Sequence, residues 1–323
     1  MSLAKITLRN EADKTGHKRS PASGGRFLGA GPLARTRYLF CYAMLLPIMA
    51  LYTYIRIIPI VRTFILSLYK WDLTRPIRPF IGLANYQALI TDERFLMAIK
   101  NTTLFSVATV FFSMLLALPL AAVLAGKLRF SPLYQAIYFL PVITPMVPMA
   151  VAWKWIYDAQ FGILNYFLSL LGISPVGWLV YPETALWAII AMSVWKVIGY
   201  NMVLFMVGIK NIPSTYYEAA EMDGASGLSL FRHITLPLLQ PIILYVLVTA
   251  TINAYNVFTQ VYVMTLGSQA APGSAVRVLV YDIYENGFQF RKMGYASAEA
   301  VVLTLIVLVL TLVQFRAMRG EQA

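Results

Sequence analysis

Residues 104–125 read LFSVATVFFSMLLALPLAAVLA, a run that contains no charged side chain. A helix crosses the hydrocarbon core of a bilayer with roughly 20 mostly apolar residues, so this run is long enough to span a membrane. A helix also satisfies its own backbone hydrogen bonds, which lipid cannot do. The stretch therefore predicts a transmembrane helix, which indicates that the chain is a helical membrane protein.

Five further apolar segments of near-spanning length flank this run, at about residues 38–58, 136–157, 185–208, 238–264 and 296–315. The chain of 323 residues is 59% hydrophobic and only 12% charged. A soluble domain carries about 25% charged residues, enough to cover a water-facing surface. We predict an all-α, polytopic membrane protein with six transmembrane helices over residues 38–316, and we expect a cytoplasmic tail at residues 317–323.

The lysines and arginines predict the orientation. Residues 1–37 carry eight of them against two acidic residues, and we expect this basic tail to be disordered and cytoplasmic. With both termini inside, the inner segments hold fourteen lysines and arginines and the outer loops nine. This bias favours an N-in and C-in topology. Basic residues beside a first span mark the cytoplasmic side more often than a nucleic-acid site, so we expect no nucleic-acid partner.

The sequence lacks the residues that several kinds of chemistry require. Cys41 is the single cysteine, and His17 and His233 have no metal-ligand neighbours at suitable spacing. A P-loop is absent, since Gly126 and Lys127 are followed by leucine. We therefore expect no catalytic site, metal or cofactor in this chain. Two alternatives, an intramembrane enzyme and a secondary transporter, would need a nucleophile–base pair or buried acids, for which Glu299 alone is thin support.

The loop at residues 209–237, between the fourth and fifth spans, predicts an elbow of short helices. Residues 212–226 read IPSTYYEAAEMDGAS, and residues 231–237 read FRHITLP. We expect Ser214 to cap a first helix, Gly224 to end it and Ser226 to cap a second. The elbow would be joined directly to a membrane helix.

The same loop resembles the EAA loop of ABC-importer permeases in residues 218–220 (EAA), 223–225 (DGA) and 234–237 (ITLP). The resemblance implies that the loop forms coupling helices that dock into a groove on an ATPase subunit. Matching positions are Glu218, Ala219, Ala220, Asp223, Gly224, Ala225, Leu236 and Pro237. ATP and magnesium would then belong to the partner subunit.

The resemblance extends to permeases of the maltose and glycerol-3-phosphate type through residues 67–73 (SLYKWDL), 80–86 (FIGLANY), 161–165 (FGILN), 282–288 (DIYENGF) and 294–298 (GYASA). It departs at Glu299, where an apolar residue is expected. It implies a bacterial inner-membrane subunit that carries a carbohydrate with a second homologous permease, two ATP-binding subunits and a periplasmic or extracytoplasmic solute-binding protein. An acidic, alginate-type oligosaccharide is the specific substrate expected within the family, although no residue derives it.

Polar residues within the spans mark a candidate substrate path. Thr249, Asn253, Asn256 and Gln260 would share one helical stripe, and Ser193, Lys196 and Tyr200 would form another. Such stripes face protein or a water-filled cavity. We take Lys196, Tyr200, Asn253, Asn256 and Gln260 as path residues. Contacts between helices are the alternative for the amides, and snorkelling or pairing is the alternative for Lys154 and Lys196. Glu299 would reach the outer headgroup zone.

Overall fold

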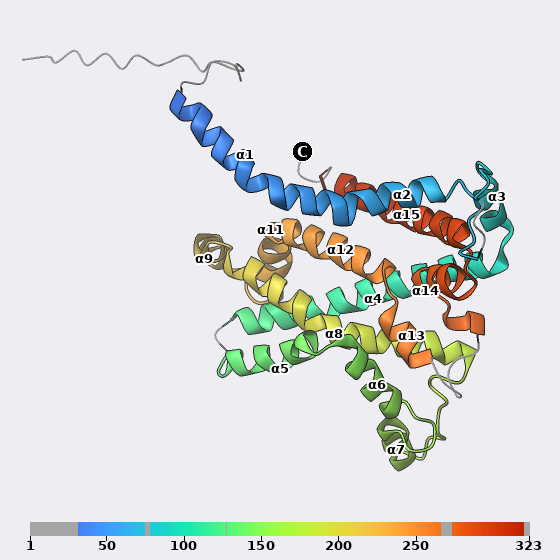
Figure 1. Cartoon of the computed structure of the whole chain (residues 1–323). Coiled ribbons are helices and arrows are strands. Elements are labelled where there is room, and N and C mark those ends of the chain that lie inside the picture. Colours follow the sequence, from blue (N-terminus) through green and yellow to red (C-terminus); the bar gives the residue numbers. More distant parts are fainter. Residues whose placement is uncertain (1–31, 75–77, 127, 266–272, 320–323) are drawn as a thin grey trace, which may run out of the picture. The chain divides into compact units, whose positions relative to one another are not determined.

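The computed structural model describes residues 32–74, 78–126, 128–265 and 273–319 (Figure 1). Within these ranges the chain forms helices and one isolated antiparallel bridge between Tyr69 and Phe80, and no β-strand. Of the tail predicted to be disordered, residues 1–31 lie outside the described residues. The chain divides into two compact units, residues 1–59 and 60–323.

The first unit contains α1 (Pro32–Tyr52) and a π-helical turn, Thr53–Ile57. Proline is favoured at the first position of a helix because its missing N–H would have no partner there. α1 therefore begins inside the stretch predicted as a tail. The helix runs on into α2 (Ile58–Leu66), which makes it longer than the predicted span at residues 38–58.

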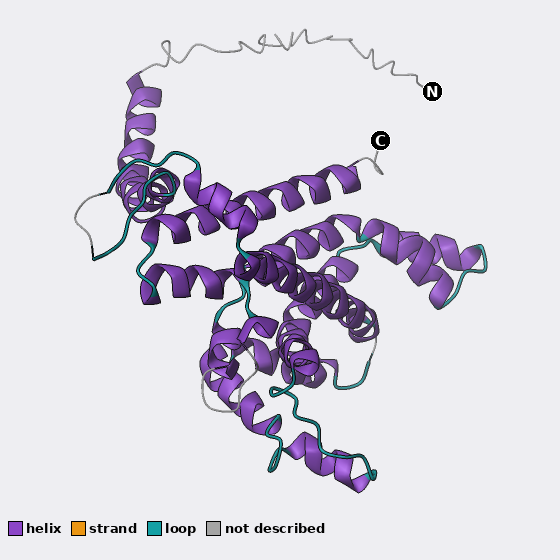
Figure 2. Cartoon of the chain, turned by 90° about the vertical axis from the view of Figure 1, so that its right-hand side faces the viewer, coloured by secondary structure: helices purple, strands orange, loops and turns teal. Residues whose placement is uncertain are grey.

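The second unit is built around two long neighbouring helices, α4 (Glu93–Ala125) and α8 (Pro182–Lys210) (Figure 1). Figure 2 shows that the described part of the chain consists of helices joined by loops. The last long helix is α15 (Met293–Arg319). Four helices of the described chain are long and apolar enough to cross a membrane. Two bent pairs bring the number to six if each pair is one span, as the sequence predicted.

The third predicted span is one of these bent pairs. α5 (Ser131–Ile143) and α6 (Met146–Ile156) meet at an angle of 100°. Pro145 causes the break, because proline lacks an N–H and forces the residue before it out of helical geometry. Thr144 accordingly has extended backbone, with φ −73° and ψ 132°.

The fifth predicted span is broken twice. The short helices that precede α12 (Gln240–Tyr255) make an angle of 68° with it, and α12 ends before α13 (Thr259–Thr265) begins. Asn256 follows α12 with φ −91° and ψ 20°. The prediction of one continuous helix over residues 238–264 was therefore wrong. A polar, non-helical segment of this kind is tolerated at membrane depth where it lines a cavity.

Short helices occupy both ends of the second unit. α9 (Ser214–Met222), α10 (Leu228–Leu230), a π-helical turn Phe231–Thr235 and α11 (Leu236–Leu238) form the elbow end. The opposite end, here called the distal end, holds α3 (Ala84–Thr91), α7 (Ile163–Leu170), a 3-10 turn Gly273–Val276, α14 (Leu279–Tyr284) and a π-helical turn Glu285–Gln289.

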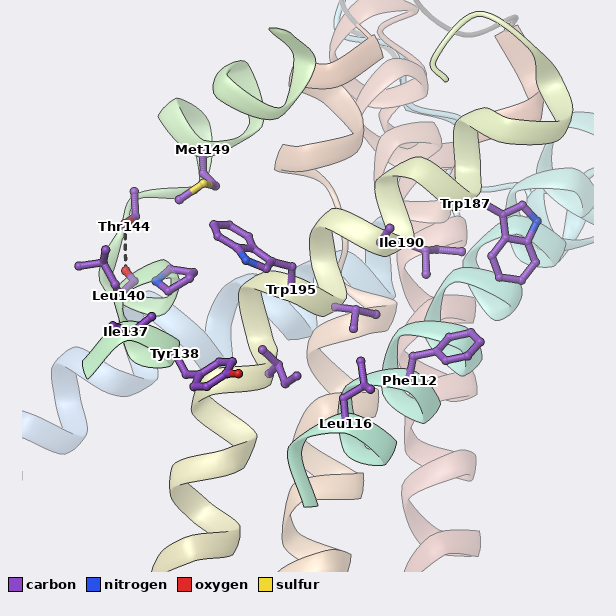
Figure 3. Close-up of a pocket in the computed structure, with 14 residues that line it drawn as sticks. Phe112, Leu116, Ile137, Tyr138, Leu140, Thr144, Met149, Trp187, Ile190 and Trp195 are labelled. Carbon is purple, nitrogen blue, oxygen red and sulfur yellow. Dashed lines mark hydrogen bonds between the residues drawn. The ribbon is translucent and has the colours of Figure 1, made fainter. Parts of the chain in front are cut away.

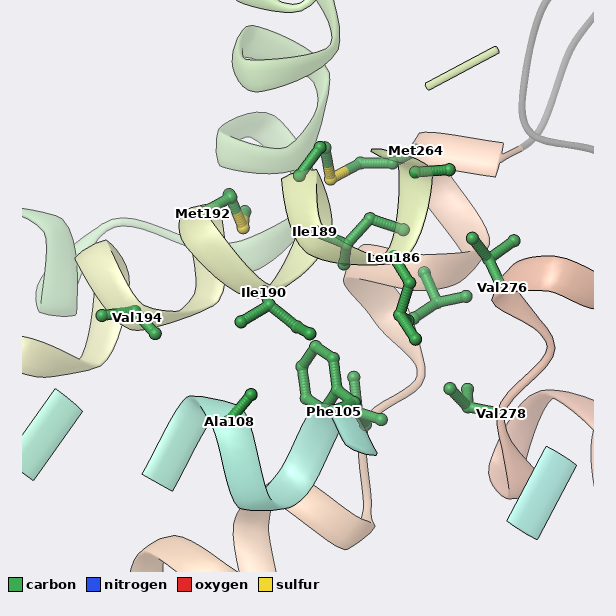
Figure 4. Packing of buried hydrophobic residues seen from close by; sticks show 14 of the residues in the cluster. Phe105, Ala108, Leu186, Ile189, Ile190, Met192, Val194, Met264, Val276 and Val278 are labelled. Carbon is green, nitrogen blue, oxygen red and sulfur yellow. The ribbon is translucent and has the colours of Figure 1, made fainter. Parts of the chain in front are cut away.

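The main apolar core lies between α4 and α8, toward the distal end. Figure 4 shows Phe105 of α4 against Leu186 and Ile190 of α8, with Val276 and Val278 from the segment before α14 beside them. These side chains are almost completely buried. In lipid the packing of side chains, more than their escape from water, holds helices together. The core thus fixes the frame on which both ends are mounted.

Candidate coupling elbow and polar cavity

The elbow begins with α9, whose end is fixed by glycine. The N–H of Ala225 donates to the carbonyl of Ala220 at 2.9 Å, and the N–H of Gly224 donates to Glu221 at 3.0 Å. This pair of bonds is a Schellman motif, which needs a left-handed residue at its centre. Gly224 supplies it with φ +85°. The prediction that Gly224 ends the helix is confirmed.

The predicted serine caps are absent. α9 starts at Ser214 without a side-chain capping bond, and Gly227, not Ser226, precedes α10. The elbow is instead tied by Tyr217, whose hydroxyl lies 3.0 Å from that of Thr235 in the π-helical turn. A serine cap is commonly paired with Glu or Gln three residues later, and Tyr217 occupies that position after Ser214. Tyr217 uses that position for a contact beyond the local helix.

Most of the elbow residues point to the outside of the second unit. Glu218, Ala219, Asp223, Gly224 and Pro237 are exposed, while Ala220, Ala225 and Leu236 are half-buried. Two apolar side chains beside them are also open, Met222 with 89% and Leu228 with 79% of its surface exposed. An exposed apolar patch rimmed by acidic groups is typical of a protein-docking surface. The eight coupling residues predicted from the sequence thus lie in one exposed elbow.

A polar cavity of about 300 Å³ lies among α4, α8, α12 and the segment after α12. We call it the amide cavity. Its polar lining consists of Thr109, Ser113, Ser193, Tyr200, Asn201, Thr249, Asn253, Asn256, Thr259 and Gln260. Four of the five predicted path residues, Tyr200, Asn253, Asn256 and Gln260, are therefore brought together.

The break after α12 changes how the amides reach the cavity. Asn253 belongs to α12 and Gln260 to α13, so a continuous helical stripe does not hold them. The side-chain amide of Asn256 donates to the carbonyl of Ile252 at 2.7 Å and helps to end α12. Both Asn253 and Asn256 are exposed to the cavity side of the chain. Unwound backbone and amide side chains together line this space.

Lys196, the fifth predicted path residue, does not line the amide cavity. Its ammonium group donates to the carbonyl of Pro141 at 2.8 Å and to that of Thr144 at 2.7 Å. The last carbonyls of a helix lack intrahelical partners, and a cation is favourable beside them. Lys196 therefore stabilises the broken end of α5, which is the pairing alternative named for it. Ser193 and Tyr200 of the same predicted stripe do line the cavity.

A larger cavity, of about 700 Å³, opens among α4, α5, α6 and α8. Figure 3 shows Phe112, Leu116, Trp187, Ile190 and Trp195 around it, and the hydroxyl of Thr144 bonded to the carbonyl of Leu140. Its lining is almost wholly apolar. Hydroxyl-rich ligands need hydrogen-bond partners, which the smaller amide cavity offers and this space does not.

The distal end is held by asparagines whose role was not predicted. Asn165 donates to the carbonyls of Val176 at 2.9 Å and Ala159 at 3.1 Å. Its oxygen accepts from the indole N–H of Trp178 at 3.0 Å and from the N–H of Val176 at 3.1 Å. Asn165 lies in the FGILN stretch, so the quoted resemblance was the signal that marked it.

The FIGLANY stretch contains a second asparagine that joins separate segments in the same way. Asn85 donates to the carbonyls of Ser67 at 2.7 Å and Tyr69 at 3.1 Å, and the Tyr86 hydroxyl donates to that of Ser67 at 2.7 Å. Gly294 is also required here, because a Cβ would lie 2.0 Å from the carbonyl oxygen of Tyr69. The distal loops are thus closely fitted to one another.

Charged groups are concentrated at the same end. Arg277 forms ion pairs with Asp282, at 2.6 Å, and with Glu285. Burial alone would lower the pKa of Arg277, but the two carboxylates outweigh it and raise that pKa. Glu299 is fully buried and accepts from the Asn286 amide at 2.8 Å. The prediction that Glu299 reaches the headgroup zone was wrong, because packing encloses its side chain inside the protein.

Together, the broken membrane helices, the exposed elbow and the polar cavity define a transport subunit of the membrane. The chain belongs to the family of the inner-membrane component of binding-protein-dependent transport systems, which matches residues 95–319. Members of this family are non-catalytic transmembrane components. The identification as an ABC permease is confirmed, and neither the intramembrane enzyme nor the secondary transporter is supported.

Individual relatives agree with this assignment. The chain is 36% identical over 283 residues to the probable ABC transporter permease protein YurN of Bacillus subtilis (strain 168), covering 86% of this chain and 94% of YurN. It is 34% identical over 278 residues to the trehalose/maltose transport system permease protein MalF of Thermococcus litoralis, covering 86% and 93%. The match therefore extends over nearly the full length of each relative.

A solved structure shares the fold. The chain resembles a chain of a bacterial ABC transporter involved in the import of the acidic polysaccharide alginate, with a TM-score of 0.77 and 25% sequence identity. The superposition covers 89% of this chain and 98% of that one. The helical architecture, with its long helices and bent helix pairs, is thus an ABC-permease fold.

Proposed function

We propose that the chain forms half of the translocation path of an ATP-driven carbohydrate importer in the bacterial cytoplasmic membrane. Its partners would be a second, homologous permease, two ATP-binding subunits and an extracytoplasmic solute-binding protein. ATP and Mg²⁺ would bind to the ATP-binding subunits. Sugar-transport permeases among the relatives support a carbohydrate substrate, since they cover most of this chain.

The observation that carries the proposal is the exposed elbow. α9 holds Glu218, Ala219 and Ala220, and the Schellman motif at Gly224 turns the chain directly after them. Met222 and Leu228 offer apolar contact area beside the acidic groups. The small side chains of Ala219 and Gly224 permit close approach of another surface. Tyr217 and Thr235 would pass force from this surface to α12, because they tie α9 to the turn that leads into it.

The amide cavity supports a path for a hydroxyl-rich solute. Hydroxyl and amide side chains both donate and accept hydrogen bonds, which matches the groups of a sugar. Tyr200, Asn253, Asn256 and Gln260 supply such groups from α8, α12 and α13. Because α12 and α13 are separate helices, movement at the elbow is able to shift α12 relative to α13 and so change the cavity.

The coupling proposal is tested with two substitutions at one position, in the complete importer reconstituted into proteoliposomes. Gly224→Trp places a bulky ring on the docking face, whereas Gly224→Asn keeps a residue that tolerates a left-handed backbone. We expect the tryptophan variant to lose ATP-driven uptake by about a hundredfold or more, which corresponds to about 3 kcal/mol of docking energy. The asparagine variant should retain most uptake.

Copurification of the ATP-binding subunits separates docking from misfolding. The Gly224→Trp permease should still insert and pair with the second permease, but it should lose the ATP-binding subunits. Normal uptake by this variant would contradict docking at the elbow. Equal losses for the tryptophan and asparagine variants would show that the backbone conformation matters, and not the docking surface.

The elbow would face the cytoplasm, with both termini on the same side. This orientation is supported by the excess of basic residues in the tail and the inner loops. In a Cys41→Ser background, a single cysteine at Ser174 of the distal end should react with an impermeant reagent added outside intact cells. A cysteine at Ser226 of the elbow should react after lysis only. The reverse pattern would refute the orientation.

A further inference from the structure

Two buried carboxyl groups at the distal end have no part in the proposed path. Glu299 lies near the start of α15 and is fully buried, and Asp282 lies in α14 with 1% of its surface exposed. The two helices are neighbours (Figure 1). The carboxyl groups are within hydrogen-bond reach of each other, so their contact joins α14 to α15. We call them the acid pair.

Each carboxyl group of the acid pair has one oxygen with a donor and one without. Oε1 of Glu299 accepts from the Asn286 amide at 2.8 Å, and Oδ1 of Asp282 accepts from Arg277 at 2.6 Å. Oε2 of Glu299 and Oδ2 of Asp282 are buried and accept from no donor in the described part of the chain. Because a buried acceptor without a donor is costly, the pair needs one hydrogen between its two open oxygens.

The surrounding charges give Glu299 no counter-ion. The charged and titratable groups around it are Asp282, Glu285, Arg277, Tyr295 and, at the start of α4, Asp92 with Arg94. Arg277 pairs with both Asp282 and Glu285, and Arg94 is exposed beside Asp92. The helices α3 and α12, which also pack on α15, contain no charged residue. An ionised Glu299 would thus be a buried charge without a partner.

A proton fits the acid pair better than a metal ion does. Two carboxyl groups that share a buried site cannot both ionise without a large cost, and one of them then keeps its proton. Magnesium and calcium take about six or more oxygen ligands, whereas the pair offers two free oxygens. No group of three or more metal-ligating side chains occurs among the described residues.

The acid pair completes a junction of three helices. The carbonyl of Arg277 accepts from the Asn101 amide at 3.0 Å, and the N–H of Leu279 donates to the Thr102 hydroxyl at 2.8 Å. These bonds attach the start of α14 to α4. The acid pair attaches α14 to α15 on another side. Two negative charges at this contact would repel each other and separate α14 from α15.

We propose that Glu299 keeps its proton and donates it from Oε2 to Oδ2 of Asp282, and that this shared proton is a pH-sensitive latch that holds α14 against α15. Opening the latch releases the proton to water and leaves two carboxylates. The proton does not depend on the substrate or on the proposed path. That the latch responds to the pH outside the cell rests on the proposed orientation, in which the distal end faces outward.

The proton count gives the sign of the pH effect. In the open form Glu299 is in water, where a glutamate releases its proton above about pH 4.3. The closed form holds one proton more, so its stability relative to the open form falls as the pH rises. The opening equilibrium changes by up to about tenfold per pH unit, until the closed form loses the proton as well.

Infrared spectroscopy tests for the proton directly, because a carboxylic acid and a carboxylate absorb at different frequencies. The purified importer complex is compared with its Glu299→Gln variant from about pH 6 to about pH 10, where carboxyl groups in water are ionised. Glutamine keeps a donor and an acceptor but cannot titrate. We expect a carboxylic acid band in the unchanged complex that the variant lacks. Glu183→Gln, at an exposed acid of the same end, is the matched control and should keep the band.

The variant Asp282→Asn tests the partner of the proton. Its amide would supply a donor to Oε2 of Glu299, so the carboxylate of Glu299 would no longer need a proton. The band should then disappear at a pH about one unit lower, the effect of about one hydrogen bond. An unchanged band would show that Asp282 does not share the proton. Each variant is measured as an intact complex eluting at its normal size.

Hydrogen exchange of residues 278–290 tests the latch. Exchange is compared between the unchanged complex and Glu299→Gln at the same pH, so that the intrinsic pH dependence of exchange cancels. The ratio of the two rates should grow with pH by up to about tenfold per unit. A ratio that stays constant would overturn the latch, even with the band present.

The remaining outcomes concern the proton itself. Absence of the band at every pH would show an ionised Glu299 and would overturn the proposal. A band that appears only after chelation of metal ions would also overturn it, in favour of a cation at the acid pair. Failure of saccharide uptake by the complete importer would count against the proposed function, whereas the band and the exchange ratio would still decide the latch.

Discussion

The elbow end and the distal end of the second unit are built in opposite ways. At the distal end, side chains of Asn85, Asn165 and Asn286 are bonded to backbone or to buried acids of other segments. At the elbow end, α9 is held mainly by its own Schellman motif and by the Tyr217–Thr235 contact. The comparison teaches that similar family motifs serve different purposes, fastening loops at one end and presenting a surface at the other.

Glycine shows the difference most clearly. A Cβ on Gly294 would lie 2.0 Å from the Tyr69 carbonyl oxygen, whereas a Cβ on Gly224 would meet nothing within 4 Å. Gly294 is needed for close packing, and Gly224 for its positive φ. Gly294 is therefore required by the atoms that pack against it, and Gly224 by the conformation of its own backbone.

The largest predicted effect tests this contrast. Gly294→Ala should destabilise the protein by about 3 kcal/mol or more, because the backbone of Tyr69 cannot move aside. Gly224→Ala should cost about 1–2 kcal/mol, the price of a left-handed alanine. The measurement is the fraction of detergent-purified complex that survives a series of heating steps. Equal survival of the two variants would break the comparison.

A second, smaller effect is expected for the asparagines. Asn165→Ala removes the group that joins three segments of the distal loop and leaves buried donors and acceptors without partners, at a cost of about 2–3 kcal/mol. Asn211, exposed after α8 at the elbow end, gives the matched control variant Asn211→Ala. Limited proteolysis between residues 157 and 181 should accelerate in the first variant only. Unchanged cleavage would show that Asn165 does not hold the distal loop together.

The smallest effect concerns the elbow itself. Tyr217→Phe deletes one hydroxyl contact, which contributes about 1 kcal/mol, so uptake per assembled complex should fall about two- to fivefold while heat survival stays near normal. Tyr216→Phe is the control, because Tyr216 is 51% exposed on the same helix. Reduced assembly in place of reduced uptake would mean that Tyr217 holds the structure together, as Asn85 and Asn165 do at the distal end. The two ends would then differ less than proposed.

The sequence predicted element types better than continuity. Residues 104–125 and 185–208 each fall within one continuous helix, α4 and α8. Pro119 lies inside α4 without breaking it, whereas Pro145 ends α5. At the second site, Lys196 donates to the carbonyls of Pro141 and Thr144, which lie at the break. The sequence alone does not show which of its prolines breaks a helix.

The candidate sites divide along the same line. Glu218, Ala219 and Gly224 were named through the resemblance to the EAA loop, a motif made by residues close together in the chain. Tyr200, Asn253 and Gln260 were named by helical spacing, and they do meet, but through a break at Asn256 that the spacing did not contain. Lys196 was assigned to the path because its helix face adjoins Tyr200, yet distant carbonyls hold it.

By itself, the sequence determined that the chain is a helical membrane protein with several candidate spans, that an elbow of short helices follows the fourth predicted span and that the chain belongs among transport subunits. Hydrophobic length and local turn chemistry act within a few residues, so they are readable without a fold. Only the tertiary structure decided where the spans break, which polar groups share a cavity, and that Lys196 and Glu299 are bonded inside the protein. A buried polar group takes whatever partner packing brings to it, and that partner lies 55 residues from Lys196, at Pro141, and 13 from Glu299, at Asn286.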